Sequence, residues 1–284
     1  MPDDENPIRI ARWTASSRKR WLAQAAYPLI WAINRPAAAW LARAIYDFAL
    51  RCNGIAINYD GRHGLSAPEE RFLDSIAGRL RGQTVFDVGA NVGSYSEALR
   101  RVAPEAKIHA FEPHPATFAR LVERMAGQDI TLVNQAMSDQ PGSQQLYDFA
   151  AADGSTQASL SREAIGIFDA GIVAHPVSAS TIDAYMSENA VARLALLKID
   201  TEGFDLKVLH GAQQAIRDKR IDLIQFEFVP ANIATHVTMR DIFEALPGYR
   251  IHRLCLNGAL LPLFPYEVKR CEIYITQNLV AVPG

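Results

Sequence analysis

The chain is poor in the residues that build disulfide frameworks or zinc sites. Its 284 residues include three cysteines, Cys52, Cys255 and Cys271, which are scattered, odd in number and without a CxxC spacing. This usage is typical of a reducing compartment and favours neither a disulfide framework nor a zinc site. A G-x-S-x-G sequence is also missing, so nothing indicates a serine-hydrolase nucleophile.

A strong charge of one sign and a long hydrophobic run are absent as well. The formal net charge is −2, whereas a generic nucleic-acid coat carries a strong basic excess, so no nucleic-acid partner is expected. No uninterrupted apolar run reaches the roughly 18 to 20 residues of a membrane span, and the N-terminus is acidic where a secretory signal is basic. The resulting expectation is a cytoplasmic protein.

The first 56 residues differ in composition from the rest of the chain. We expect residues 1–56 to form a basic helical extension and residues 57–284 to form the main domain. Pro28 and Pro36 predict helical pieces broken near each proline. Basic residues gather at Arg9, Arg12 and positions 18–20. The segment also holds every tryptophan of the chain: Trp13, Trp21, Trp31 and Trp40.

Three roles are open for this extension. It could pack on the main domain, join two copies of the chain into a homo-oligomer, or lie peripherally on the anionic inner surface of a membrane. Apolar stripes mostly mean protein packing, which favours the first two roles. Membrane contact would make a lipid-linked saccharide more attractive as substrate, whereas a dimer would suit a soluble metabolite equally well.

From residue 65 onward the hydrophobic pattern alternates between helical and strand periods. Ser66 as N-cap, Pro68 and Glu69 predict a helix over 65–80 that starts with a capping box. The alternation predicts a parallel sheet covered on both faces, a doubly wound α/β fold. Strands are predicted within 84–89, 107–113, 130–139, 194–203, 221–229, 249–254 and 271–278, an edge strand within 140–149, further helices over 95–102, 118–125, 206–216 and 238–246, and a long loop over 150–176.

The stretch TVFDVGANVGSYSEAL, residues 84–99, puts an acid and two glycines at a strand-to-helix corner. Gly89 and Gly93 let a ligand approach the backbone without intervening Cβ atoms, and the helix start offers free N–H groups. Asp87 ends the strand at the same place, and Glu112 lies at the tip of the next strand, 23 residues after Gly89. An acid there can accept hydrogen bonds from a ribose diol, so this arrangement indicates a nucleoside-containing cofactor.

The spacing of the corner distinguishes between such cofactors. Nicotinamide-binding proteins use G-x-G-x-x-G around a pyrophosphate, whereas this chain has G-A-N-V-G preceded by the carboxylate of Asp87. A buried acid would repel a pyrophosphate, but it suits a ligand that carries an ammonium and a sulfonium and no phosphate. S-adenosylmethionine fits this description, and a nucleotide-dependent oxidoreductase becomes the weaker alternative.

Five separated motifs resemble the FkbM family of S-adenosylmethionine-dependent methyltransferases, over roughly residues 57–255. They are VFDVGANVGSYS, FEPHP, NQAMSD, LLKIDTEGFDLKVLHGA and IQFEF. The resemblance implies a class I methyltransferase (Rossmann-like) fold, with a mostly parallel seven-stranded sheet whose last strand runs antiparallel. It also implies in-line O-methylation of a hydroxyl, typically on a sugar, glycan or polyketide-like natural product.

The same resemblance, with the neighbours of each motif, assigns a cofactor site. Glu112 matches the acid that binds ribose, and residues 136–139 fall where the adenine edge is held. The expected cofactor-binding residues are Asp87, Gly89, Ala90, Asn91, Gly93, Ser94, Glu112, Pro113, Ala136, Met137, Ser138, Asp139 and Asp200.

The catalytic residues are expected at the ends of two later strands. Alternation places Lys198 and Asp200 on one strand face, Glu202 follows them, and Glu227 closes the next strand. Methyl transfer to a hydroxyl needs a general base, and Asp200, Glu202 and Glu227 are all candidates. A structural salt bridge between Lys198 and Glu227 is the alternative explanation of these charges.

Two further alternatives stay open. A divalent cation held by this carboxylate group could orient a saccharide or small-molecule acceptor, although no residues are assigned as metal ligands. The chain could also be a non-catalytic scaffold, membrane-associated or not, that keeps the fold and the cofactor without transferring a methyl group.

Overall fold

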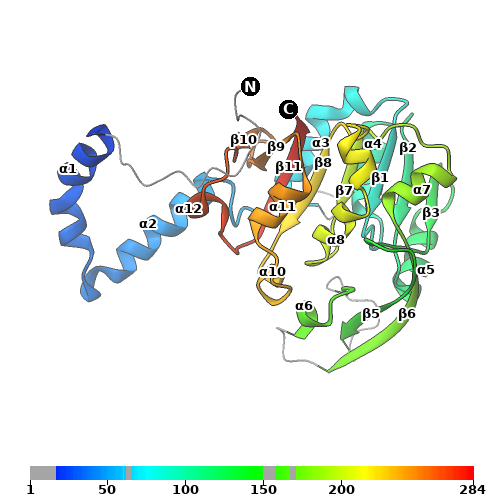
Figure 1. Cartoon of the computed structure of the whole chain (residues 1–284), viewed down its shortest axis with the longest axis horizontal. Coiled ribbons are helices and arrows are strands. Elements are labelled where there is room, and N and C mark those ends of the chain that lie inside the picture. Colours follow the sequence, from blue (N-terminus) through cyan, green and yellow to red (C-terminus); the bar gives the residue numbers. More distant parts are fainter. Residues whose placement is uncertain (1–16, 60, 62–64, 150–157, 167–170) are drawn as a thin grey trace, which may run out of the picture.

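The computed structural model describes residues 17–59, 61, 65–149, 158–166 and 171–284. At its centre is an eight-stranded sheet (Figure 1). The strands are β1 (Thr84–Val88), β2 (Lys107–Phe111), β3 (Ile130–Val133), β7 (Leu196–Ile199), β8 (Ile224–Phe228), β9 (Tyr249–Leu254), β10 (Leu260–Pro262) and β11 (Gln277–Pro283). They lie in the order β10-β9-β11-β8-β7-β1-β2-β3.

The pairing confirms the predicted doubly wound, mostly parallel sheet. β1 pairs in parallel with β2 and β7, β2 with β3, and β7 with β8, whereas β11 is antiparallel to both β8 and β9. The expected count of seven strands is corrected to eight, because β10 pairs antiparallel with the outer edge of β9. The strand expected within 271–278 begins only at Gln277, because α12 (Val268–Cys271) occupies the start of that stretch.

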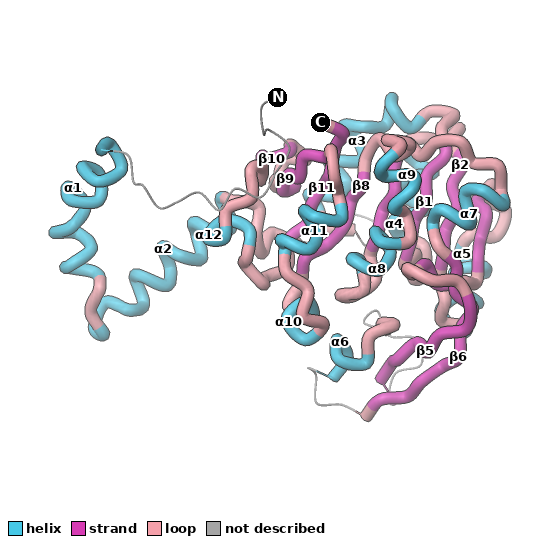
Figure 2. Tube along the Cα trace, in the orientation of Figure 1, coloured by secondary structure: helices cyan, strands magenta, loops and turns pink. Residues whose placement is uncertain are grey.

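Helices cover both faces of the sheet (Figure 2). On one face, α3 (Ala67–Leu80) and α4 (Ser94–Val102) share a core with β1 and β2, and α5 (Pro115–Arg124) packs beside them on β2. The opposite core is formed by α7 (Ile182–Glu188), α8 (Asp205–His210), α9 (Gln213–Arg217) and α11 (Met239–Ala245). Because both faces are covered, β1, β7 and β8 are buried along almost their whole length.

The start of α3 agrees with its prediction. The carboxylate of Glu69 accepts hydrogen bonds from the backbone N–H of Ser66 at 3.3 Å and from its hydroxyl at 2.7 Å. Phe72, Leu73 and Ile76 form the buried stripe. This anchored helix also positions Glu69 beneath the candidate site described below.

A second, smaller sheet corrects two predictions. It contains β4 (Ala136–Met137), β5 (Gly142–Phe149) and β6 (Ile172–Ser180), in the order β4-β6-β5. The strand expected within 130–139 is therefore divided between two sheets, and the edge strand within 140–149 belongs to the smaller one. The reason is long-range pairing, because β5 and β6 are antiparallel along their whole length and bury Leu146 and Val177.

The loop expected over 150–176 is also corrected in part. The start of β6 and α6 (Arg162–Gly166) lie within it, while residues 150–157 and 167–170 lie outside the described residues. A short α10 (Ala231–Ala234) contacts α6. The helix expected over 206–216 is divided into α8 and α9 at Gly211.

The N-terminal helices stand away from the body (Figure 1). α1 (Ser17–Ile33) continues through Pro28, so the break expected there is wrong; the solvent-exposed position lets water satisfy the carbonyl that loses its partner. A turn, η1 (Pro36–Ala38), separates α1 from α2 (Ala39–Cys52) and confirms the break near Pro36. Within the described residues, none of the helices combines the length and apolar character needed to cross a bilayer.

The junction of α8 and α9 packs closely against the chain that follows β4, and this contact can be tested. A Cβ atom on Gly211 would lie 2.0 Å from the carbonyl oxygen of Ser138, whereas nothing lies within 4 Å of one on Gly78 in α3. Gly211→Ala should lower the free energy of unfolding by about 2 kcal/mol or more, because neither backbone can easily move aside. The control Gly78→Ala should raise it by about 0.5 to 1 kcal/mol. Urea denaturation measures both, and an unchanged midpoint for Gly211→Ala would contradict this packing.

Candidate functional site

The glycine turn after β1 is a place where two backbones touch. Gly89 has φ +80°, and a Cβ atom on it would lie 1.8 Å from the carbonyl oxygen of Asp200, which follows β7. Gly93 has φ +90° and is the N-cap of α4, where a Cβ atom would lie 2.7 Å from the side chain of Leu121. Both positions therefore need glycine for conformation and for space.

Glu112 ties this turn to the end of β2. One oxygen of its carboxylate accepts the backbone N–H of Asn91 at 2.9 Å, and the other accepts the backbone N–H of His114 at 2.8 Å. Burial raises the pKa of Glu112 to about 7, although both hydrogen bonds act to lower it. Each oxygen keeps a second lone pair, so the carboxylate can still accept hydrogen bonds from a diol.

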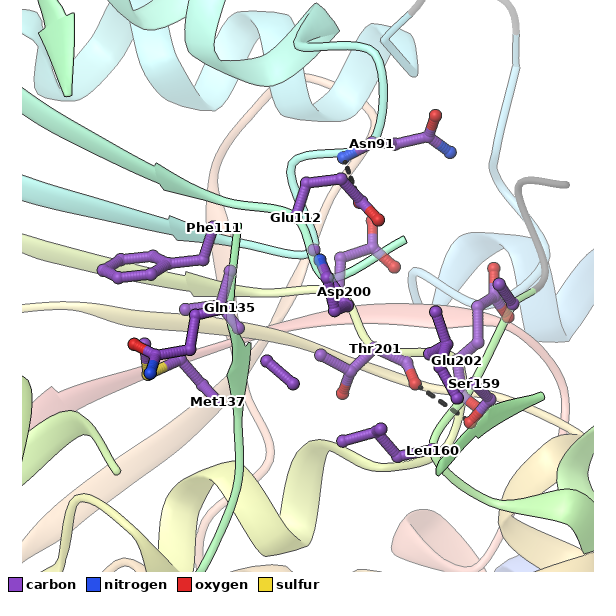
Figure 3. Close-up of a pocket in the computed structure, with 16 residues that line it drawn as sticks. Asn91, Phe111, Glu112, Gln135, Met137, Ser159, Leu160, Asp200, Thr201 and Glu202 are labelled. Atoms are coloured by element: carbon purple, nitrogen blue, oxygen red, sulfur yellow. Dashed lines mark hydrogen bonds between the residues drawn. The ribbon is translucent and has the colours of Figure 1, made fainter. Parts of the chain in front are cut away.

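A pocket with about 550 Å³ of empty space, including its open mouth, lies at the carboxyl ends of β1, β2 and β7. Figure 3 shows Asn91 and Glu112 beside Asp200, with Thr201 and Glu202 next to Ser159 and Leu160, and with Met137 on the other side of the pocket. The lining residues are Val88, Gly89, Asn91, Phe111, Glu112, Pro113, Gln135, Ala136, Met137, Leu146, Ala158, Ser159, Leu160, Asp200, Thr201 and Glu202.

Asp87 lies beneath the glycine turn and is not part of the pocket lining. Its carboxylate is 1% exposed and accepts a hydrogen bond from the hydroxyl of Ser96 at 2.6 Å. Burial raises the pKa of Asp87 to about 6, against the lowering effects of Ser96 and of the Lys198 charge. Asp87 therefore contributes negative electrostatic potential to the pocket without lining it.

Lys198 is a buried cation between two carboxylates. Its ammonium lies 3.4 Å from Glu69 and 3.4 Å from Asp200, so these residues take the place of the Lys198–Glu227 salt bridge considered from the sequence. Burial acts to lower the pKa of Lys198, but the charges of Asp200 and Glu69 outweigh it and hold that pKa well above its ordinary value. Lys198 is 1% exposed and does not line the pocket, so it positions Asp200 from behind.

Hydrogen bonds extend this arrangement across three elements. Gln225 in β8 donates to Glu69 in α3 at 3.0 Å, and the hydroxyl of Tyr95 in α4 donates to Gln225 at 2.6 Å. All three side chains are buried. The network therefore joins α3, α4 and β8 to the buried cation on β7.

The segment after β7 supplies the polar wall of the pocket. Glu202 has φ +50°, and burial together with the charges of Asp200 and Asp205 raises its pKa to about 8. The hydroxyl oxygen of Thr201 is buried and has no hydrogen-bond partner among the described residues. The carboxylates of Asp200 and Glu202 make this wall acidic, so it suits a polar guest.

The remaining predicted residues divide into two groups. Pro113, Ala136 and Met137 line the pocket as expected. The others lie outside its lining: Ala90, Gly93, Ser94, Ser138, Asp139 and Glu227.

The outlying residues have other partners. The hydroxyl of Ser138 accepts a hydrogen bond from Gln144 at 2.8 Å, and Asp139 pairs with Lys207 at 2.7 Å. The hydroxyl of Ser94 accepts a hydrogen bond from Arg124 at 3.2 Å. Glu227 is partly buried, and burial together with the Asp200 charge raises its pKa well above the ordinary value.

Several lining residues were missed from the sequence. Thr201 lies between two predicted residues in the DTEG stretch, and Gln135 immediately precedes Ala136, so adjacency could have identified both. Ser159 and Leu160 follow a segment without periodicity and carried no signal. In the described part of the chain, no group of three or more His, Cys, Asp or Glu side chains is arranged to hold a metal ion, and a divalent cation stays a prediction without assigned ligands.

The comparison with protein families identifies the group to which this site belongs. Residues 87–251, more than half of the chain, match the methyltransferase FkbM domain. The chain belongs to the FkbM methyltransferase family. The match begins at Asp87 and includes every lining residue of the pocket.

Two curated relatives are similar over part of their length. The chain is 30% identical over 164 residues to 31-O-demethyl-FK506 methyltransferase FkbM of Streptomyces tacrolimicus, covering 47% of this chain and 61% of that protein. It is 27% identical over 158 residues to Methyltransferase 1 of Beauveria bassiana, covering 49% of this chain and 61% of that protein. The match thus spans about three fifths of each relative.

Among solved structures, the methyltransferase FkbM from Methylobacillus flagellatus KT is similar to this FkbM-family chain. The superposition covers 94% of this chain and 71% of that structure. The sequence identity is 16% and the TM-score is 0.46.

The buried cation behind the pocket gives a prediction for stability. Lys198→Met would leave Glu69 and Asp200 without their cation and should cost about 3 to 5 kcal/mol of unfolding free energy. Lys207→Met removes an exposed pair with Asp139 and should cost about 1 kcal/mol or less. Urea denaturation of both variants measures the contrast. Equal, small losses would show that Lys198 does not hold the carboxylates together.

Proposed function

We propose that this protein is an S-adenosylmethionine-dependent O-methyltransferase. The observation that carries the proposal is the composition of one pocket. Its lining combines the glycine turn, whose spacing differs from that of a pyrophosphate-binding motif, and Glu112 with the polar residues Asp200, Thr201 and Glu202. Membership of the FkbM family supports the same chemistry. When bound, S-adenosylmethionine would supply an electrophilic methyl group.

The residues present fit this cofactor. Glu112 can accept both hydroxyls of a ribose on its remaining lone pairs. Met137, Leu146 and Leu160 offer an apolar slot for a flat adenine ring, and Gln135 adds an amide at its edge. The negative potential of Asp87 and Asp200 favours the ammonium and sulfonium charges of this cofactor and disfavours the pyrophosphate of a nicotinamide cofactor.

The acceptor we propose is a hydroxyl of a sugar, glycan or related natural product. The name of the Streptomyces relative describes methylation of an oxygen in FK506, a natural product. In this chain, the carboxylates of Asp200 and Glu202 form a wall that can accept hydrogen bonds from a polyhydroxylated molecule. The part of the pocket beside α6 and Ser159 would then receive the acceptor.

Glu202 is the best-placed general base among the three candidates. Glu227 does not line the pocket, and the Asp200 carboxylate is already engaged by the Lys198 ammonium at 3.4 Å. Glu202 lines the pocket and has a pKa raised to about 8 by burial and by its acidic neighbours. A base with a pKa near the working pH accepts a proton most effectively.

Calorimetry tests the cofactor assignment. S-adenosylmethionine and S-adenosylhomocysteine should bind the protein, and Glu112→Gln should weaken both by about tenfold or more, because an ionised acceptor makes the stronger hydrogen bond. The exposed residue Glu123 on α5 offers the matched control Glu123→Gln, which should bind as the parent does. Binding of NAD alone would replace this proposal with an oxidoreductase. Tight binding without methyl transfer to any of a panel of sugars, glycans and polyketides would favour a scaffold.

A pH profile tests the role of Glu202. Methyl transfer should rise with pH to about 8, because Glu202 is protonated and inactive as a base below its pKa. Glu202→Gln should reduce turnover by about 10²-fold to 10⁴-fold and remove this dependence, while S-adenosylmethionine still binds. Glu188→Gln, at the exposed end of α7, is the control and should keep both. A pH dependence that persists in Glu202→Gln would assign the base to another residue.

A further inference from the structure

The helices α1 and α2 present an apolar surface that no described residue of the chain covers. Across residues 24–49, all of which the structure describes, no side chain is buried. Trp31 is 61% exposed, and Trp40 and Phe48 are each 71% exposed. The other large exposed apolar residues here are Tyr27, Leu29, Ile30, Ile45 and Tyr46. Monomeric proteins rarely leave so many large apolar side chains of one segment in water, so an interaction surface is indicated.

The shape of the extension places this surface far from the pocket. Figure 1 shows α1 and α2 as two arms that meet at a bend and project from the body beside α12. Trp31 and Trp40 lie on either side of this bend, at the ends of the two helices. In α2, Trp40, Ala44 and Phe48 are spaced by four residues and therefore share one face.

The same segment carries a strong excess of positive charge. Residues 17–52 include six lysines or arginines and one acid, Asp47. The guanidinium of Arg35 lies 3.7 Å from the ring centroid of Trp31 and also donates to the Trp31 carbonyl at 3.2 Å. Arg43 and Arg51 are exposed on α2. Basic and aromatic residues therefore lie close together around the bend and along α2.

We propose that α1 and α2 dock the protein on an anionic lipid surface, with the aromatic side chains in the interfacial region and the basic ones among the headgroups. Tryptophan and tyrosine prefer this region because they carry an apolar body and a polar edge. Each lysine or arginine near an anionic leaflet adds attraction. A second copy of the chain fits less well, because it would oppose two surfaces of the same positive sign.

The length of the apolar stretch sets how the helices lie. Residues 25–33 are free of charged residues, but a bilayer span requires about 20 such residues. α1 and α2 are therefore too short in apolar sequence to cross the bilayer and would lie in the plane of its interface. The docking rests on α1 and α2 alone and is independent of the methyltransferase chemistry proposed above.

The tryptophan distribution allows a direct test on the unmodified protein. All four tryptophans lie within the first 40 residues, so tryptophan emission reports on the extension without background from the body. Vesicles of phosphatidylglycerol mixed with phosphatidylcholine should shift the emission to the blue and sediment the protein. The protein should bind pure phosphatidylcholine vesicles at least about tenfold more weakly, and added salt should weaken its binding to the anionic vesicles.

Variants separate the two contributions. Trp31→Ala with Trp40→Ala should weaken vesicle binding by about tenfold or more through lost apolar contact, and Arg43→Gln with Arg51→Gln should do so through lost charge. Val122→Ala with Leu256→Ala, which removes two exposed apolar side chains from the body, should bind as the parent does. Unchanged thermal unfolding of each variant would show that the fold is intact.

Three outcomes would overturn the proposal. One is the absence of both a blue shift and sedimentation with anionic vesicles. Another is equal binding to pure phosphatidylcholine. The third is a concentration-dependent dimer, seen by light scattering without lipid and lost in the double tryptophan variant, which would make a second copy the occupant of this surface.

Discussion

The carboxyl edge of the main sheet depends on one buried cation, Lys198. Its side chain brings the carboxylates of Glu69 and Asp200 within 3.4 Å of a single ammonium, and Gln225 ties Glu69 to the neighbouring strand. Without that charge the acids packed here would repel one another in a medium that screens poorly. Beside Lys198, the backbone N–H of Asp200 donates to the carbonyl of Val88 at 2.9 Å, and this pairing brings the Asp200 carbonyl against Gly89. Glycine at position 89 is therefore required by the packing against the end of β7, as well as by any ligand that approaches the turn.

Local signals in the sequence were sufficient to predict the fold wherever one segment determines its own structure. The capping box of α3 and the apolar runs of β1, β7 and β8 belong to this class. The smaller sheet could not be predicted in the same way, because β5 pairs with β6 across an intervening segment without periodicity, and only that pairing buries Leu146 and Val177. Pro28 failed as a signal for a related reason: an exposed helix can hydrogen-bond to water where a buried one would break.

The same distinction between local signals and long-range pairing applies to the residues of the candidate site. Gly89, Asn91, Glu112 and Asp200 follow strands whose ends must meet, so their presence in one pocket could be predicted from topology. Ser138 and Asp139 follow β4, which leaves the main sheet, and they bond instead with Gln144 and Lys207. Ser159 and Leu160 reach the pocket only because the smaller sheet folds over it. Sequence reasoning thus predicted the side of the site that the parallel sheet builds, together with Ala136 and Met137 of β4, and missed Ser159 and Leu160.

Net charge illustrates how an average over a chain can conceal its organisation. The formal charge of −2 describes a nearly neutral protein, yet residues 17–52 hold six basic residues and one acid, so the rest of the chain carries an acidic excess. Because the two helices project from the body, these opposite charges are separated in space and do not cancel at short range. An anionic surface would attract the extension and repel the acidic body. The same field that favours contact therefore also orients it, with the projecting arms toward the surface and the bulk of the body away from it.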